Sequence, residues 1–273
     1  MRCSDVINAV NSFAPEEFAC KWDNVGLNLG RRERSVGKIL LALEITDRVA
    51  DYAIAHQVDM IITHHPFIFR PIRNITSDNA QGRVIMKLLH NDISCYSVHT
   101  NYDMIPGGMA ELFAERLGYS PEEPIADVVE VTMPNGKNRR IGSGRMMTDY
   151  EGIHLTDLCA TLKAKFGIKH LEVYKPDGGA EDDPVFHRIA VCPGSGKSMI
   201  GECMDLGAEV FITADVTYHE AMDAVANGLT IVNAGHYGME AIFVSDFEKH
   251  LSKFLSSEVE VLAMPDSVPY LSL

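Results

Sequence analysis

The chain has 273 residues, of which 46% are apolar and 23% charged, and its 24 basic and 38 acidic side chains leave a net charge of −14 at pH 7. This composition is that of an ordinary globular protein, and the negative charge opposes the counterion release that drives nonspecific nucleic-acid binding, so a general DNA-binding role is excluded. No stretch approaches the roughly 20 apolar residues of a membrane span, and the N-terminus has the pattern of an amphipathic helix rather than a signal peptide, so we expect a soluble, cytoplasmic protein.

Strand and helix patterns alternate through the first 120 residues. Short apolar runs predict strands, and apolar residues at helical spacing predict the helices between them. An irregular segment with the only tryptophan, Trp22, follows the first helix. In chain order we expect a helix that stops before Pro15, strands at 38–44, 58–63 and 93–98, and helices after the Thr46 cap, at about 80–91 and between Gly108 and Gly118.

The last third of the chain repeats this alternation. We expect strands at 187–192, 208–213, 229–233 and 258–262, with helices at about 197–206, 217–227 and 239–254 between them. The middle stretch contains a helix over 155–166, which we expect Thr156 to cap, and the polar loop PDGGAEDDP. We therefore divide the chain into a first α/β half (1–120), a connector packed on the halves (121–186) and a second α/β half (187–273).

The apolar strands and intervening helices predict an α/β fold. Near-continuous runs of Ile, Leu and Val are typical of sheets that helices cover on both faces. We expect two similar, interlinked α/β halves in three layers, with helices covering mixed sheets. In such folds ligands gather beyond the carboxyl ends of the strands, so the residues that follow each strand are the candidates for chemistry.

Four predicted strand ends carry side chains that bind metals. They lie in the segments ITHHP, VHTNYD, ADVTYHE and AGHYGME. Imidazole and carboxylate groups together suit first-row divalent ions and do not fit a thiolate-rich structural zinc site. A single histidine in such a loop is more often a hydrogen-bonded structural residue, but the coincidence of four loops from both halves favours a metal site.

Two of these segments have an informative geometry. His64 and His65 can each reach a separate ion only if the chain has left the strand, and Pro66 supports that. His236 and Glu240 are four residues apart at the start of a predicted helix, which places both side chains on one face. Because a carboxylate can bridge two ions, we sketch a dinuclear centre with Glu240 as the bridge.

Three other features allow more than one interpretation. The six cysteines form no Cys-x-x-Cys pair, which favours buried, reduced thiols. The segment CPGSGKSM lacks the first glycine of a Walker loop, and it is either a plain turn or an anion site at Gly194–Ser198 with Lys197 close by. Asp23 and Asn24 in WDNVGL fit a turn that binds its own backbone, and spacing does not decide their role.

Six segments of the chain, taken in order, resemble the Nif-three-like family, whose members carry the name GTP cyclohydrolase I type 2 homologues. These segments are WDNVGLNLG, ITHHPFIF, VHTNYD, CPGSGKS, ADVTYHEA and AGHYGME. The resemblance covers about residues 3–265 and implies a metal site between the two halves. It also implies a toroidal homohexamer. Ala214 stands where we expect glycine and Glu44 where many relatives have aspartate. The metal ligands that the resemblance implies are His64, His65, Asp103, His236 and Glu240, with His99 close to the metals.

The function that follows is a metal-dependent hydrolase acting on a nucleotide or a related small molecule. Two divalent ions per chain, drawn from zinc, iron, manganese, cobalt or nickel, would activate water, and His219 or His99 could shuttle the proton. Lys197 could meet a triphosphate. The alternative is a ring-shaped metal-binding scaffold or metal-trafficking protein without turnover. We expect a homo-oligomer with no membrane partner.

Overall fold

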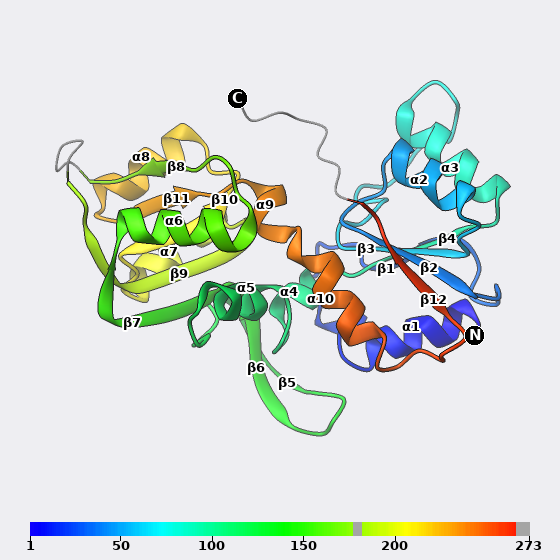
Figure 1. The fold of residues 1–273 in the computed structure, drawn as a ribbon, viewed down its shortest axis with the longest axis horizontal. Helices are drawn as coiled ribbons and strands as arrows, with labels where there is room; N and C mark the ends of the chain where they lie inside the picture. Colours follow the sequence, from blue (N-terminus) through cyan, green and yellow to red (C-terminus); the bar gives the residue numbers. More distant parts are fainter. Residues whose placement is uncertain (177–181, 266–273) are drawn as a thin grey trace. The chain divides into compact units, whose positions relative to one another are not determined.

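The computed structural model describes residues 1–176 and 182–265, and the chain forms two compact units (Figure 1). Unit 1 contains Met1–Tyr102 and the segment that begins at Phe243, and unit 2 contains Asp103–Ile242. The predicted polar loop PDGGAEDDP lies mostly outside the described residues. None of the helices in the described part of the chain combines the length and the apolar character needed to cross a membrane.

Unit 1 is built on a five-stranded mixed sheet with the order β1-β4-β3-β2-β12. Strands β12, β2, β3 and β4 are parallel, and β1 pairs with β4 in the antiparallel sense. The strands are β1 (Gly26–Leu29), β2 (Lys38–Ala42), β3 (Met60–Thr63), β4 (Ser94–Ser97) and β12 (Glu260–Ala263). The helices are α1 (Cys3–Asn11), η1 (Glu16–Phe18), α2 (Asp47–Ala55), α3 (Ala80–His90), α4 (Thr100–Met104) and α10 (Ile242–Leu251), the last two of which cross the unit boundaries.

Helices cover both faces of this sheet, as the apolar strands require. Leu40, Ile61 and Cys95 point to one face and pack with the buried residues of α2 and α3. On the opposite face, Tyr96 donates a hydrogen bond of 2.9 Å from its hydroxyl to Glu16 in η1, next to α1. Thr46 caps α2 as predicted, because its side chain accepts a hydrogen bond from Val49 N.

Unit 2 contains a second five-stranded mixed sheet, in the order β7-β9-β10-β11-β8, and a separate hairpin of β5 and β6. Strands β9, β10 and β11 are parallel, and β7 and β8 flank them in the antiparallel sense. The strands are β5 (Ala126–Thr132), β6 (Asn138–Ser143), β7 (Arg145–His154), β8 (Glu172–Tyr174), β9 (Val185–Ser195), β10 (Val210–Ala214) and β11 (Thr230–Asn233). The helices are α5 (Met109–Leu117), α6 (Leu155–Phe166), η2 (Lys197–Met199), α7 (Ile200–Asp205), α8 (Tyr218–Ala226) and α9 (His236–Glu240).

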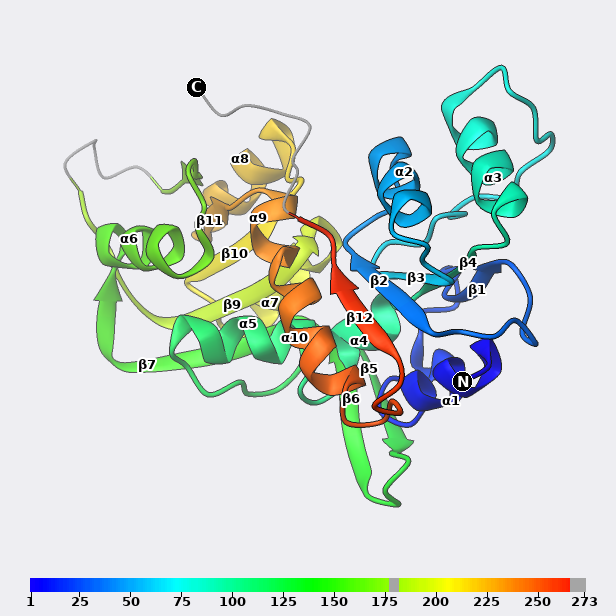
Figure 2. The same ribbon diagram turned by 45° about the vertical axis from the view of Figure 1, so that its right-hand side comes forward.

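The expected α/β fold with two similar halves and mixed sheets is confirmed. The chain passes between units near 102 and 242, whereas the sequence suggested divisions at 120 and 186. The reason is strand pairing. Strand β12 returns to β2 of unit 1 (Figure 2), and β7 and β8 of the expected connector complete the second sheet (Figure 1). The cap of α6 also differs, since Asp183 accepts a hydrogen bond of 2.9 Å from the Thr156 backbone N–H.

Candidate functional site

The paired histidines of unit 1 leave the strand as predicted. Strand β3 ends at Thr63, and His64 and His65 follow it. The backbone of His65 is held on both sides, because its N–H donates to Leu43 O at 2.9 Å and its carbonyl accepts from the Thr63 hydroxyl at 2.8 Å. The two imidazole rings lie 5.2 Å apart between centroids. Adjacent residues of a regular strand would have pointed to opposite faces of the sheet.

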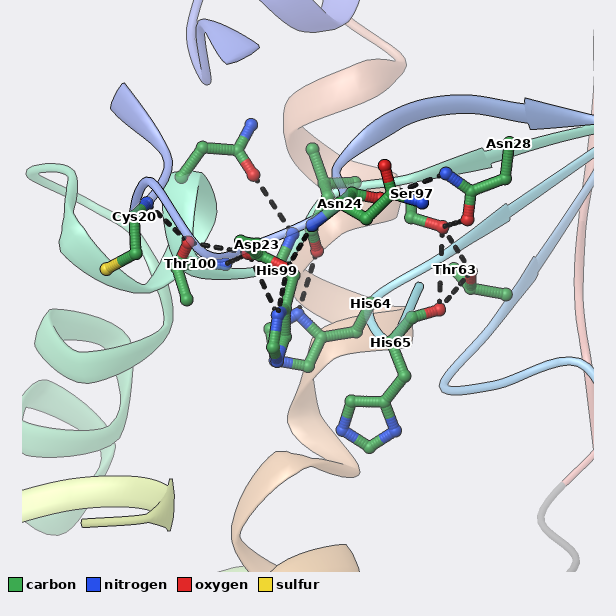
Figure 3. Close-up of polar contacts among 12 residues, drawn as sticks. Cys20, Asp23, Asn24, Asn28, Thr63, His64, His65, Ser97, His99 and Thr100 are labelled. Carbon is green, nitrogen blue, oxygen red and sulfur yellow. Dashed lines mark hydrogen bonds and ion pairs between the residues drawn. The ribbon is translucent and has the colours of Figure 1, made fainter. Parts of the chain in front are cut away.

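Two histidines of unit 1 are fixed in the same tautomer (Figure 3). His64 Nδ1 lies 2.9 Å from Val98 O, and His99 Nδ1 lies 3.0 Å from both carboxylate oxygens of Asp23. A carbonyl or an ionised carboxylate only accepts hydrogen bonds, so each Nδ1 carries the proton. Each ring therefore presents Nε2 as its metal-binding atom, which is the arrangement of most metal-ligating histidines.

The three histidines of unit 1 form a group that fits a divalent ion. One ligand nitrogen from each of His64, His65 and His99 lies within 4.8 Å of the others. Nitrogens that share a tetrahedral zinc ion at about 2.0 to 2.1 Å are separated by roughly 3.3 to 3.4 Å, so the three rings would move closer together to share one ion. His64 is fully buried and the other two are half-buried.

Asp23 is a supporting residue that the sequence did not identify as part of the site. Its fully buried side chain binds His99 and also accepts from the backbone and the hydroxyl of Thr100, at 3.1 and 2.6 Å. Burial alone would raise the pKa of Asp23, but the hydrogen bond and charge of His99 and the bonds from Thr100 outweigh it and lower the pKa. The turn in WDNVGL therefore supplies the carboxylate that orients His99.

Unit 2 brings together His236 and Glu240, as their four-residue spacing predicted. Both lie in α9, with His236 Nε2 2.9 Å from Glu240 Oε2 and His236 Nδ1 2.7 Å from Asp215 Oδ2. Burial by itself would lower the pKa of His236, but the hydrogen bond and charge of Glu240, joined by those of Asp215, raise it to about 9. Asp215 thus has the same role toward His236 that Asp23 has toward His99.

The carboxyl end of β9 makes room for the Glu240 carboxylate. Gly194 has a φ of +73°, and a Cβ at this position would lie 2.2 Å from Glu240 Oε1 and 3.4 Å from His236 Nε2. Thr213 fixes the loop, since its hydroxyl accepts from Gly196 N at 2.9 Å and donates to Gly194 O at 3.0 Å. Only glycine provides both the backbone conformation and the space at position 194.

This geometry favours the turn over the anion site as the role of Gly194–Ser198. Lys197, which could have met a triphosphate, lies 3.5 Å from Glu220 Oε1 in an ion pair. The residues that follow Gly196 form the three-residue helix η2 instead of the start of a long helix. The sequence showed a glycine near the end of this strand, but it did not show that Gly194 would lie opposite Glu240.

Asp103 and Glu240 both act on the buried thiol of Cys192. Burial raises the pKa of Cys192 well above its usual value, and the charges of Asp103 and Glu240 add to that effect. The thiol is therefore protonated and is not suited to bind a metal as a thiolate. Cys3, Cys95 and Cys203 are also free and buried, which agrees with the predicted reduced thiols.

His219 is separate from the histidine groups. It lies exposed in the first turn of α8, and its ring contacts that of Tyr218 at 5.5 Å between centroids. It is not in any metal-binding group found among the described residues. The role of His219 as a proton shuttle stays a prediction. Ala214, which stands where we expected glycine, does not prevent the next residue, Asp215, from binding His236.

Comparisons with known proteins point to one family over almost the entire chain. The profile of the family described as Duf34/NIF3 (NGG1p interacting factor 3) matches residues 1–269. A protein of Clostridium perfringens named GTP cyclohydrolase 1 type 2 homolog is 34% identical over 267 residues, which cover 98% of this chain and 97% of the relative. A protein of the same name from Streptococcus pneumoniae is 33% identical over 254 residues, with 93% of this chain and 91% of the relative covered.

A solved structure shows the same fold. The crystal structure of a Bacillus cereus protein related to NIF3 has a TM-score of 0.86 and 23% sequence identity to this chain. The match covers 100% of this chain and 99% of that protein.

Proposed function

The chain belongs to the Duf34/NIF3 family, and from the metal-binding chemistry of its two units we propose that it is a metal-dependent hydrolase acting on a nucleotide or a related small molecule. In this proposal five ligands bind two divalent ions per chain, and His99 lies close to the ions. The ligands are His64, His65, Asp103, His236 and Glu240.

The observation that carries the proposal is the common orientation of three histidines. His64, His99 and His236 each donate Nδ1–H to an oxygen, which turns Nε2 of each ring away from that oxygen. Nε2 of His236 then faces the Glu240 carboxylate. Two of these oxygens belong to the carboxylates of Asp23 and Asp215, which raise the basicity of the imidazole. Structural histidines do not need this repeated arrangement, whereas metal ligands do.

The donor set also fits the metals. Imidazole nitrogens and carboxylate oxygens, with the buried thiol of Cys192 protonated, suit zinc, iron, manganese, cobalt or nickel. The space opposite Gly194 admits the Glu240 carboxylate, which is the ligand that we assign as the bridge between the two ions. Once bound, such ions supply an activated water and polarise a substrate oxygen.

The chain's own residues would position the reactants and move the proton. Asp23 holds His99 in one orientation, so that Nε2 of His99, when it does not bind an ion, can accept a proton. His219 is the second candidate for this step, and its exposure leaves it accessible to solvent. The name of the relatives favours GTP as the first substrate to test.

The test compares metal-loaded wild-type protein with Glu240→Gln on GTP, a panel of nucleotides and phosphoesters. We expect turnover by the wild type and loss of turnover in Glu240→Gln with metal retained in part. Glu202→Gln, an exposed change on α7 of the same unit, serves as the matched control and should keep full activity. No turnover of any compound by metal-loaded wild type would contradict the hydrolase and leave a metal-binding scaffold or metal-trafficking protein.

The proposal includes a toroidal homohexamer in the cytoplasm, which the resemblance and the sequence pattern suggested. Light scattering coupled to size-exclusion chromatography should give a mass six times the 30.2 kDa of the chain. A monomer at micromolar concentration would contradict this part of the proposal.

A further inference from the structure

Two exposed aromatic side chains lie against the histidine group of unit 1. Trp22 is 63% exposed and Phe69 is 47% exposed. Their ring centroids are 6.1 Å apart at 73°, and each ring meets His99 edge-on, at 6.1 Å for Trp22 and 6.4 Å for Phe69. Single exposed aromatic residues are common, but this pair borders the polar group that we assign to metal binding.

The segment that carries Phe69 is held in place by side-chain hydrogen bonds. Asn24 Nδ2 donates to Ile68 O at 2.5 Å, and Ile68 N donates to Asn28 Oδ1 at 3.3 Å. Gln81 Nε2 donates to Phe67 O at 3.1 Å from the first turn of α3. A ligand that contacts Phe69 would therefore lose little affinity to the ordering of this segment.

The same segment forms an open cavity of about 450 Å³. Its volume lies in the range of small-molecule sites, roughly 300 to 1,000 Å³. Apolar and cationic groups share the lining, which includes Phe67, Phe69, Arg70, Ile72, Arg73 and Gln81.

Arg70 and Arg73 have no counter-ion within residues 1–176 and 182–265. Both are exposed, and neither makes a hydrogen bond or an ion pair with any described residue. Both guanidinium groups are therefore available to an anionic ligand, although the chain as a whole has 38 acidic and 24 basic side chains. Guanidinium groups bind phosphate in a bidentate geometry, and aromatic faces stack on planar rings.

We propose that Trp22, Phe69, Arg70 and Arg73 form a binding site for a planar aromatic ring that carries a phosphate, the chemistry of a mononucleotide. The aromatic pair would contact the ring and the two arginines the phosphate. This inference rests on the proposed function for the adjoining metal ions and deepens it, because it assigns the residues that select the ligand. Binding itself needs no metal and no turnover.

The only tryptophan of the chain provides a direct measurement. Trp22 fluorescence is titrated in the full-length protein with chelator present, using guanosine 5′-monophosphate, guanosine and ribose 5-phosphate as probes. We expect saturable quenching by the monophosphate with at least tenfold higher affinity than by guanosine, and little quenching by ribose 5-phosphate. Equal affinities for the monophosphate and guanosine, or no saturable quenching, would overturn the proposal.

Variants test separately the aromatic residues that would contact the ring and the arginines that would bind the phosphate. The double change Arg70→Ala and Arg73→Ala should lower the affinity for the monophosphate at least tenfold and leave guanosine binding unchanged. Phe69→Ala should weaken both ligands, and Phe69→Tyr should restore them. Arg48→Ala, an exposed change on α2 of the same unit, is the matched control and should bind as wild type. An equal loss in Arg48→Ala would overturn the assignment of the arginines.

Two further readouts distinguish the competing explanations. If a second copy of the chain covered this surface, iodide would fail to quench Trp22 in the ligand-free protein, which would overturn the proposal. Binding without turnover of any nucleotide in the metal-loaded protein would contradict the hydrolase and support this site. Turnover without quenching of Trp22 would support the hydrolase and overturn this site.

Discussion

The change Gly194→Ala tests whether the carboxyl end of β9 sets the position of the Glu240 carboxylate in unit 2. An alanine Cβ would lie 2.2 Å from Glu240 Oε1, and Cβ atoms in real structures essentially never approach a heavy atom closer than 3.0 Å. The carboxylate oxygen must therefore retreat by at least ~0.8 Å, while metal–ligand distances tolerate only about 0.2 Å. The φ of +73° adds about 1 to 2 kcal/mol of backbone strain.

We expect Gly194→Ala to lower metal affinity at least tenfold, about 1.4 kcal/mol at 25 °C. The assay is a competition titration against a chromophoric chelator. In urea, the free energy of unfolding of the chelated Gly194→Ala protein should be about 1 to 2 kcal/mol lower than that of the chelated wild type, because of the backbone strain.

Two matched variants separate strain from steric conflict. Gly167 also has a positive φ, +66°, but a Cβ there would meet nothing within 4 Å, so Gly167→Ala should show the strain and keep the metal affinity. Gly201 has neither feature and lies in α7, so Gly201→Ala should keep the affinity and stabilise the fold by up to about 1 kcal/mol. Wild-type metal affinity in Gly194→Ala would refute the reasoning.

Three further predictions concern other contacts. Asp23→Asn and Asp215→Asn remove the carboxylates behind two histidines, so each should lower metal affinity about 10- to 100-fold in the chelator assay, and unchanged affinity would contradict their role. Arg145 is 1% exposed and pairs with Glu111 at 3.0 Å, so Arg145→Met should lower the free energy of unfolding in urea by about 3 kcal/mol, and a loss below about 1 would argue against the pair. In the chelated protein the pKa of His236 is about 9, above its ordinary value of 6.5, so the ion pair stabilises the fold below pH 6.5 and is lost as pH rises through 9. The stability gap between wild type and His236→Asn should therefore shrink from pH 6 to pH 10, and a constant gap would contradict it.

Local pattern was sufficient for some parts of the site. Pro66 indicated that His64 and His65 follow the end of β3, and helical spacing placed His236 beside Glu240. Both inferences depend on residues within four positions of one another, where strand and helix geometry fix the side-chain directions.

Contacts between distant residues were beyond that reasoning. Asp23 reaches His99 across 76 positions of the chain, and Asp215 reaches His236 across 21. The apolar run at 258–262 predicted a strand, but its pattern of apolar residues does not indicate which strand it pairs with. In the structure this strand pairs with β2. Strand partners and the residues behind the histidines depend on tertiary packing, which a single sequence does not encode in a local pattern.

The metal content per chain tests the central claim most directly. Protein purified without added metal or chelator is measured by inductively coupled plasma mass spectrometry, and apoprotein is measured again after incubation with zinc, iron, manganese and cobalt. We expect about two equivalents of divalent transition metal per chain, as in other dinuclear sites. A content that stays near zero after all four incubations would contradict it.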